Sequence, residues 1–229
     1  MARQLSFDLP AKPVLGRDDF YVSPANALAV ATVEMPHWPG GKLVLSGPDG
    51  AGKTHLAHVF ADGAGATLLP SQDVIDGIED ADTAALASSP LVIEDVPQIA
   101  GHADAEQTLF HLHNLTLANG HRLLLTGRGA PRDWGLTLPD LHSRVQGTHH
   151  VALDQPDDAL LAAVLAKLFA DRQITPRPDV IPYLVANMTR SFSEASRIVA
   201  ALDRAALDEQ RALTRPLAMR LLGQPDPNT

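Results

Sequence analysis

The chain has 229 residues, 45% of them hydrophobic, and a formal net charge of -9 at neutral pH. This length allows one full core plus a small second unit, and the acidic balance argues against strong direct binding to DNA or RNA, which needs clustered lysine and arginine. The sequence contains no cysteine, so it has no disulfide and no thiolate metal site. No apolar run approaches the ~20 residues of a membrane helix, so we expect an unexported, cytoplasmic protein.

The first predicted strand, at residues 43–45, leads directly into a phosphate-binding pattern. Residues 47–54 read GPDGAGKT and fit G-x-x-x-x-G-K-[ST]. In such a loop, backbone N–H groups and the N-terminus of the following helix face the phosphates, the lysine meets the terminal phosphates and the hydroxyl reaches Mg²⁺. The pattern therefore predicts binding of a nucleoside di- or triphosphate. The residues involved are Gly47, Gly50, Gly52, Lys53 and Thr54.

Short apolar runs alternate with helical patterns as far as residue 153. The runs lie at 43–45, 67–69, 91–93, 122–125 and 150–153. Helices are predicted between them at about 53–61, 105–119 and 138–145. This alternation predicts an α/β fold with a parallel five-stranded sheet wrapped by helices.

From residue 157 onward the pattern becomes Ala- and Leu-rich, with no further strand signal. Asp157 or Asp158 is a candidate cap for the first of four helices. These are predicted at about 158–173, 178–187, 191–210 and 215–222. We therefore expect three parts: an extended tail at 1–18, a nucleotide-binding α/β domain at 19–156 and a small all-α lid domain at 157–229.

Polar residues end two of the other predicted strands. Glu94 and Asp95 follow the run at 91–93, where one carboxylate can hold Mg²⁺ with Thr54 while its neighbour polarises an attacking water. Thr126 follows the run at 122–125, where it can contact the terminal phosphate or that water. An acidic turn and a threonine at a strand end are also ordinary features without any ligand. We treat Asp95 and Thr126 as candidate catalytic residues and Glu94 as a metal ligand.

Two arginines are candidates for contact with phosphate. Arg144 ends the segment LPDLHSR, and an arginine supplied by a neighbouring subunit is the usual way to neutralise charge on a transferred phosphoryl group. The plainer interpretation is a solvated surface arginine. Arg190 opens a long predicted helix of the lid, where it could fold over the nucleotide. Capping by Ser191 or Ser193 explains the same stretch without a ligand.

The order of these motifs resembles an AAA+ module of the bacterial replication initiator family, DnaA, over roughly residue 19 to the end. Within that family the chain is most similar to the Hda branch of regulators, which inactivate the initiator. The carrying segments, besides the motifs above, are FY at 20–21 with PAN at 24–26, LPDLHSR at 138–144 and LTRPL at 213–217.

The resemblance implies ADP or ATP with Mg²⁺ as the cofactor, and Phe20 and Tyr21 at the adenine side. It also implies that Arg144 acts in trans on a neighbouring initiator and that Arg190 reports the nucleotide through the lid. The family's initiators usually carry paired aspartates where this chain has Glu94 and Asp95. The longer glutamate moves the first carboxylate relative to Mg²⁺, so we expect the chain's own hydrolysis to be weak or absent.

Residues 4–9, QLSFDL, resemble the short peptide by which replication proteins dock on the DNA sliding clamp. A glutamine with spaced apolar side chains suits a peptide-in-groove contact, and the contacting residues would be Gln4, Leu5, Phe7 and Leu9. The resemblance thus implies two partners, the clamp and DnaA. A clamp-docked chain would stimulate ATP hydrolysis by DnaA and so prevent re-initiation.

Two other functions stay open at the level of sequence. One is a nucleotide-gated adaptor or loader for another replication protein, such as a helicase. The other is a small-molecule kinase, which is disfavoured because no second arginine cluster offers a site for an acceptor phosphate and the lid follows all the strands. The sequence also leaves open whether the chain forms a homo-oligomer.

Overall fold

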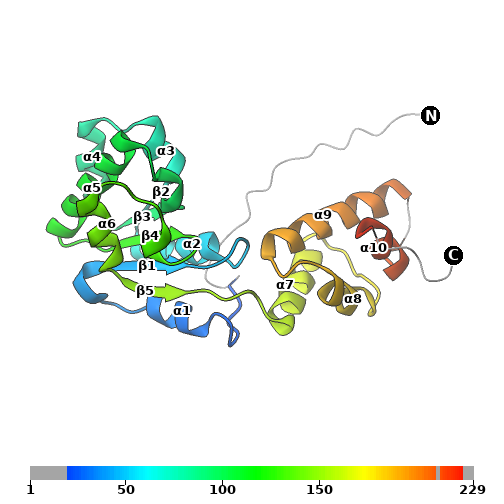
Figure 1. Cartoon of the computed structure of the whole chain (residues 1–229). Coiled ribbons are helices and arrows are strands. Elements are labelled where there is room, and N and C mark those ends of the chain that lie inside the picture. Colours follow the sequence, from blue (N-terminus) through cyan, green and yellow to red (C-terminus); the bar gives the residue numbers. More distant parts are fainter. Residues whose placement is uncertain (1–19, 210–211, 224–229) are drawn as a thin grey trace.

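The computed structural model of the chain describes residues 20–209 and 212–223. Within this part an α/β unit is followed by a purely helical unit, and the two lie side by side in Figure 1. We call the helical unit the lid. The clamp-type peptide, with Gln4, Leu5, Phe7 and Leu9, lies outside the described residues and stays a prediction.

Five parallel strands form the centre of the α/β unit in the order β2-β3-β4-β1-β5, so the predicted fold is confirmed. Each predicted apolar run overlaps one strand, with shifts of one or two residues at the ends. The three central strands β1, β3 and β4 are buried almost throughout, and strands of this kind read as continuous apolar runs, which makes them recognisable in the sequence. The strands are β1 (Lys42–Ser46), β2 (Thr67–Pro70), β3 (Leu91–Glu94), β4 (Leu123–Gly127) and β5 (His149–Ala152).

Helices cover both faces of the sheet. Leu43 and Leu45 of β1 pack on one face with α1 (Ala27–Val33) and α2 (Lys53–Ala64). Val44, between them, points to the other face, where residues of three helices complete a second core. Those helices are α3 (Ser71–Asp76), α5 (Ala103–Ala118) and α6 (Pro139–Gln146).

Several short elements were absent from the sequence-based prediction. They have three to seven residues each, too few for an apolar period of 3.6 to repeat. They are α1, α3, α4 (Asp80–Leu86), η2 (Pro39–Gly41), η3 (Val96–Ile99) and η4 (Pro131–Asp133).

The lid packs four helices around an apolar core of its own. They are α7 (Asp158–Asp171), α8 (Val180–Asn187), α9 (Phe192–Glu209) and α10 (Arg215–Leu221). Asp157 caps α7, because its Oδ1 accepts a hydrogen bond of 2.8 Å from the Leu160 N–H. Among the described residues no strand follows β5, and no helix is long and apolar enough to cross a bilayer.

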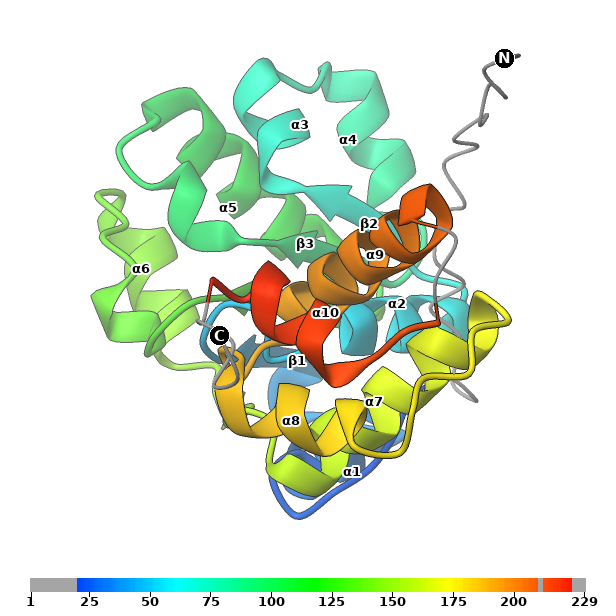
Figure 2. The ribbon, with the colours of Figure 1, turned by 90° about the vertical axis from the view of Figure 1, so that its right-hand side faces the viewer.

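The carboxyl ends of the strands face the lid. In Figure 1 the strands run toward it, and in Figure 2, seen from that side, α7 to α10 lie in front of the sheet. The turn between β1 and α2 lies at this edge, next to the beginning of α9. Parallel α/β sheets bind ligands at this edge.

Candidate nucleotide site and arginine helix

The phosphate loop, residues 47–54, links β1 to α2 as the motif requires. Gly50 (φ 71°) and Gly52 (φ 98°) adopt left-handed backbone conformations that other residues rarely reach. Gly47 is required for space, since a Cβ there would lie 2.8 Å from the carbonyl oxygen of Leu153. All three glycines of the motif therefore have a structural reason.

Lys53 lies inside the turn of this loop. Its side chain is buried, and its Nζ donates hydrogen bonds to the carbonyl oxygens of Gly47 at 2.9 Å and Pro48 at 3.0 Å. Thr54 is exposed in the first turn of α2. The loop thus gathers a positive charge and a hydroxyl where the motif would hold phosphates and Mg²⁺.

The start of α9 rests directly on the phosphate loop. The Phe192 N–H donates a 2.9 Å hydrogen bond to the Gly50 carbonyl oxygen. A Cβ at Gly50 would overlap the hydroxyl of Ser191, and a Cβ at Gly52 would lie 3.0 Å from the Phe192 ring. No sequence pattern indicated this contact, which joins the lid to the loop through backbone atoms.

The two serines at this junction form a small hydrogen-bonded group. Ser191 Oγ lies 2.7 Å from Ser193 Oγ and accepts a 3.3 Å bond from the Glu194 N–H. Ser191 therefore caps α9, as the plainer interpretation of this stretch expected.

Arg190 lies beside this junction but bonds to α7. Its guanidinium donates to an Asp158 carboxylate oxygen at 2.6 Å and to the Pro156 carbonyl oxygen at 3.4 Å. Both side chains are substantially exposed. Its suggested role in reporting the nucleotide stays a prediction.

The polar ends of β3 and β4 meet through a hydrogen bond. Asp95 has a left-handed backbone (φ 49°), and its N–H donates a 3.1 Å bond to Oγ1 of the buried Thr126. A non-glycine residue in this region stores about 1–3 kcal/mol of strain, a common feature of functional sites. The Thr126 hydroxyl thus holds the backbone of Asp95 in place through this hydrogen bond.

The predicted Mg²⁺ ligands fit the ion chemically. Glu94 Oε1 is buried and has no hydrogen-bond partner among the described residues, so it retains full capacity to accept a cation or its water. Carboxylate and hydroxyl oxygens, here from Glu94 and Thr54, are hard ligands of the kind Mg²⁺ prefers. These two side chains would hold the ion against the nucleotide's phosphates.

The two aromatic residues ahead of α1 differ in exposure. Phe20 is buried and packs edge-on against His55 of α2, with ring centroids 4.9 Å apart. Tyr21 is 42% exposed, and its carbonyl oxygen accepts a 2.8 Å bond from Asn26 Nδ2. Phe20 therefore lies against the phosphate-loop helix, while the Tyr21 ring is accessible. Their adenine contact is still a prediction.

A further ion pair joins the loop to β4. Arg128, just after this strand, donates to an Asp49 carboxylate oxygen at 3.0 Å, and both side chains are exposed. Sequence reasoning missed both residues, because an exposed pair between distant segments leaves no local pattern.

The segment that ends in Arg144, where a helix was predicted at about 138–145, forms α6. In both overall views α6 lies apart from the lid (Figures 1 and 2). Arg144 is exposed, its guanidinium lies 5.3 Å from the Phe110 ring centroid, and it forms no ion pair within the described residues. Its carbonyl oxygen accepts bonds from Lys42 Nζ at 2.9 Å and from Thr148 Oγ1 at 2.8 Å.

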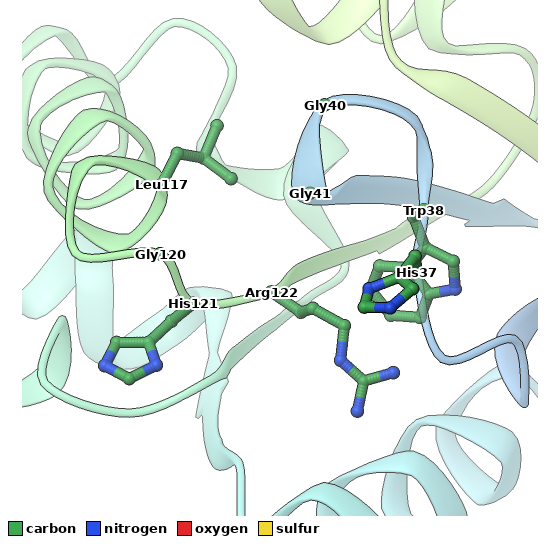
Figure 3. Close-up of a pocket in the computed structure, with 8 residues that line it drawn as sticks. All are labelled: His37, Trp38, Gly40, Gly41, Leu117, Gly120, His121 and Arg122. Atoms are coloured by element: carbon green, nitrogen blue, oxygen red, sulfur yellow. The ribbon is translucent and has the colours of Figure 1, made fainter.

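A pocket of about 280 Å³ lies at the opposite edge of the sheet, around the beginnings of β1 and β4 (Figure 3). The Arg122 guanidinium lies 5.2 Å from the Trp38 ring and 4.8 Å from the Phe60 ring. It also donates a 3.2 Å bond to the Met35 carbonyl oxygen. The pocket is therefore separate from the phosphate loop, and its arginine is occupied in holding α2 and the segment after α1.

Comparison with known proteins agrees with this geometry. Residues 157–222 match the family model described as the Hda lid domain. Domain III of the replication initiation protein DnaA from Thermotoga maritima superposes with a TM-score of 0.82 at 18% identity, covering 94% of this chain and 98% of that one. The AMPPCP-bound DnaA of Aquifex aeolicus gives a TM-score of 0.68 at 20% identity, covering 86% and 70%.

A replication initiator DnaA bound to AMPPCP and single-stranded DNA is similarly related, with a TM-score of 0.70 at 19% identity, covering 86% of this chain and 68% of that one. The predicted resemblance is thus confirmed at two levels: the chain has the fold of DnaA domain III, and its lid matches the Hda lid model.

Proposed function

We propose that this DnaA-related, Hda-like chain is a nucleotide-binding regulator of replication initiation. It binds ADP or ATP with Mg²⁺ in its phosphate loop, docks on the sliding clamp and contributes Arg144 to a neighbouring DnaA. The initiator then hydrolyses its ATP faster, and initiation is switched off.

The exposure of Arg144 is the observation that carries this proposal. It is an exposed cation with no carboxylate partner among the described residues, on a helix apart from the chain's own lid. A guanidinium in this state offers its N–H donors to an incoming anion without first breaking an ion pair. Such an arginine supplied across an interface stabilises the charge of phosphoryl transfer.

The chain's own nucleotide acts as a signal in this scheme. The Gly50 carbonyl and the Phe192 N–H link the loop to the lid, so a change at the phosphates is transmitted to α9. Weak hydrolysis of its own fits the replacement of the family's first aspartate by Glu94. Lys53 and Thr54 hold the nucleotide, with Phe20 and Tyr21 at the adenine side and Arg190 as the reporter.

The N-terminal peptide supplies recruitment in the proposal. Gln4, Leu5, Phe7 and Leu9 would occupy the clamp's peptide groove, so the regulator acts only after the clamp is loaded on DNA. A cytoplasmic location follows from this partnership.

The test measures ATP hydrolysis by DnaA with clamp-loaded DNA and the full chain. Arg144→Ala is expected to reduce hydrolysis to the initiator's unassisted rate, and an arginine supplied in trans typically accounts for about 10³-fold or more. The matched control is Arg132→Ala, which removes another exposed arginine of the same unit, one that lies 3.7 Å from the Asp133 carboxylate. Equal rates for wild type and Arg144→Ala would sink the mechanism.

A nucleotide-gated adaptor for another replication protein is the second candidate. It is favoured by large apolar side chains on both units, since Leu28 of α1 is 73% exposed and Leu207 of α9 is 70% exposed. Leu28→Ser and Leu207→Ser would then weaken capture of that protein while leaving DnaA hydrolysis unchanged. The regulator proposal instead requires that the rate of DnaA hydrolysis depends on Arg144.

A further inference from the structure

Helix α5 turns one face toward α6, which carries Arg144 and which we call the arginine helix. Glu106, Phe110 and His113 follow each other at spacings of four and three residues, which places them on one side of α5. Each acts on a different part of α6 or its flanks.

Glu106 fixes the beginning of α6. The side chain is buried, and its two oxygens accept bonds from the N–H groups of Gly101 (2.9 Å), Thr137 (2.9 and 3.0 Å) and Leu138 (2.6 Å), and from the Thr137 hydroxyl (3.0 Å). Burial by itself raises the pKa of Glu106, but these bonds outweigh it and hold the pKa below its usual value. A carboxylate here also complements the positive N-terminus of α6.

The end of α6 is fixed through the Arg144 carbonyl. Lys42 Nζ donates to this oxygen at 2.9 Å and lies 3.3 Å from His113 Nε2, so α5 reaches this end of α6 through Lys42. Thr148 Oγ1 donates to the same carbonyl at 2.8 Å. Cations near the last carbonyls of a helix are favourable.

Phe110 orients the arginine side chain itself. The guanidinium carbon lies 5.3 Å from the ring centroid, within the range of a cation–π contact. The half-buried ring packs against the core beneath the sheet, so it is a firm platform. At an exposed site such a contact favours the stacked rotamer about 2- to 5-fold.

We propose that α5 positions Arg144 for contact with a partner, and that Glu106 and Phe110 are the positioning residues. Glu106 sets the register of the helix, and Phe110 holds the guanidinium extended with its N–H donors free for a phosphate of the partner's nucleotide. The role in trans rests on the proposed function, whereas the orientation of Arg144 belongs to this chain alone.

The orientation is tested first, without any partner, by the NMR signal of the Arg144 Nε–H, assigned by its loss in Arg144→Lys. Wild type should show the ring-current shift of a proton beside an aromatic ring. Phe110→Leu should remove the shift, and Phe110→Tyr should retain it. Ile75→Val, which trims another partly buried side chain of the same core, should leave the signal unchanged. A signal that is the same in wild type and Phe110→Leu would overturn the proposal.

The second arm measures clamp-dependent DnaA hydrolysis. Phe110→Leu should lower the stimulated kcat about 2- to 5-fold at unchanged half-saturation by the regulator, and Phe110→Tyr should restore it. In an Arg144→Ala background Phe110→Leu should change nothing further. An equal loss in both backgrounds would mean a general structural effect and refute positioning. If the NMR result holds but DnaA hydrolyses ATP normally with Arg144→Ala, the proposed function fails while the positioning of Arg144 by α5 remains supported.

Discussion

The phosphate loop and the arginine helix carry the two cations of greatest interest, and the chain treats them in opposite ways. Lys53 is buried and bonded to the carbonyl oxygens of its own loop, which the lid also contacts through Phe192. The carbonyl oxygen of Arg144 accepts hydrogen bonds from Thr148 Oγ1 at 2.8 Å and from Lys42 Nζ at 2.9 Å. Its guanidinium is exposed and forms no ion pair among the described residues.

This difference separates a site that acts within the chain from one suited to act between chains. A buried ammonium bonded to carbonyl oxygens would have to change its contacts when a phosphate enters, and in our proposal this change reaches the lid through Phe192. An exposed guanidinium with a fixed backbone needs no rearrangement before it meets an external anion. The predictions below break or sharpen that contrast.

The largest effect is expected at Lys53 in the phosphate loop. Lys53→Ala should weaken ADP binding about 10³-fold, because it removes an ammonium that makes two or three charge-assisted hydrogen bonds of ~1.5–3 kcal/mol each. Titration with a fluorescent ADP analogue measures this. Lys167→Ala, which removes the 3.0 Å ion pair with Asp171 in the lid helix α7, is the control and should bind normally. Unchanged affinity in Lys53→Ala would remove the phosphate loop from the proposal.

The next largest effect is expected at Glu106, which fixes the beginning of the arginine helix. Glu106→Gln should lower the free energy of unfolding by about 3 kcal/mol, since the new amide N–H₂ faces backbone N–H donors inside a buried site. Urea unfolding followed by circular dichroism measures the change.

The pH dependence identifies its cause. The folded-state pKa of Glu106 is lowered from 4.5, so its stabilisation is complete above pH 4.5 and is lost as the pH falls through the folded value. The difference between wild type and Glu106→Gln should therefore be constant above pH 5 and narrow below 4.5. If the difference in unfolding free energy between wild type and Glu106→Gln grew as the pH fell, the lowered pKa of Glu106 would not be its cause.

His113 should give a smaller effect of different pH range. Burial, together with the charges of Lys42 and Arg144, lowers its pKa to about 4, against a bond with Asn114 that raises it. The unfolded chain takes up this proton near pH 6.5 and the folded chain only near 4, so wild type should lose about 2 kcal/mol between pH 6.5 and 5. His113→Gln should lack that slope in urea unfolding between these pH values, and an identical slope would exclude His113 as its source.

The smallest effect is expected for the exposed Arg190–Asp158 pair. Arg190→Ala should lower stability by less than about 1 kcal/mol, because surface ion pairs contribute little. If Arg190 also reads the nucleotide, the ratio of ATP to ADP affinity should fall in Arg190→Ala. Asp158→Asn, which breaks the pair and keeps the guanidinium, should preserve the ratio. A parallel change in both variants would limit Arg190 to the lid's own structure.

The elements found from the sequence share a local signature. Buried parallel strands such as Leu91–Glu94 read as apolar runs, and Gly47 to Thr54 has a fixed spacing imposed by the phosphates. Because parallel strands end at one edge, Glu94 and Thr126 could be expected near the loop. Asp157 was visible as a cap because it directly precedes an apolar helix.

What escaped the sequence depends on contacts between distant segments. Glu106 reads as an ordinary acid near a helix start, and only the fold brings the N–H groups of Thr137 and Leu138 to it. Phe192 reads as a core residue of α9, and nothing local indicates that its N–H meets Gly50. Arg144 and its ring partner Phe110 lie on separate helices.

The glycines of the phosphate loop consequently serve two neighbours at once. Gly50 and Gly52 lie in the loop predicted to bind phosphates, and they also leave room for Ser191 and Phe192 of the lid. A methyl group at Gly50 would act as a wedge against α9 while keeping the ammonium of Lys53 and the hydroxyl of Thr54. Substitution at this one position therefore changes the contact between the phosphate loop and the lid together with the left-handed backbone of the loop itself.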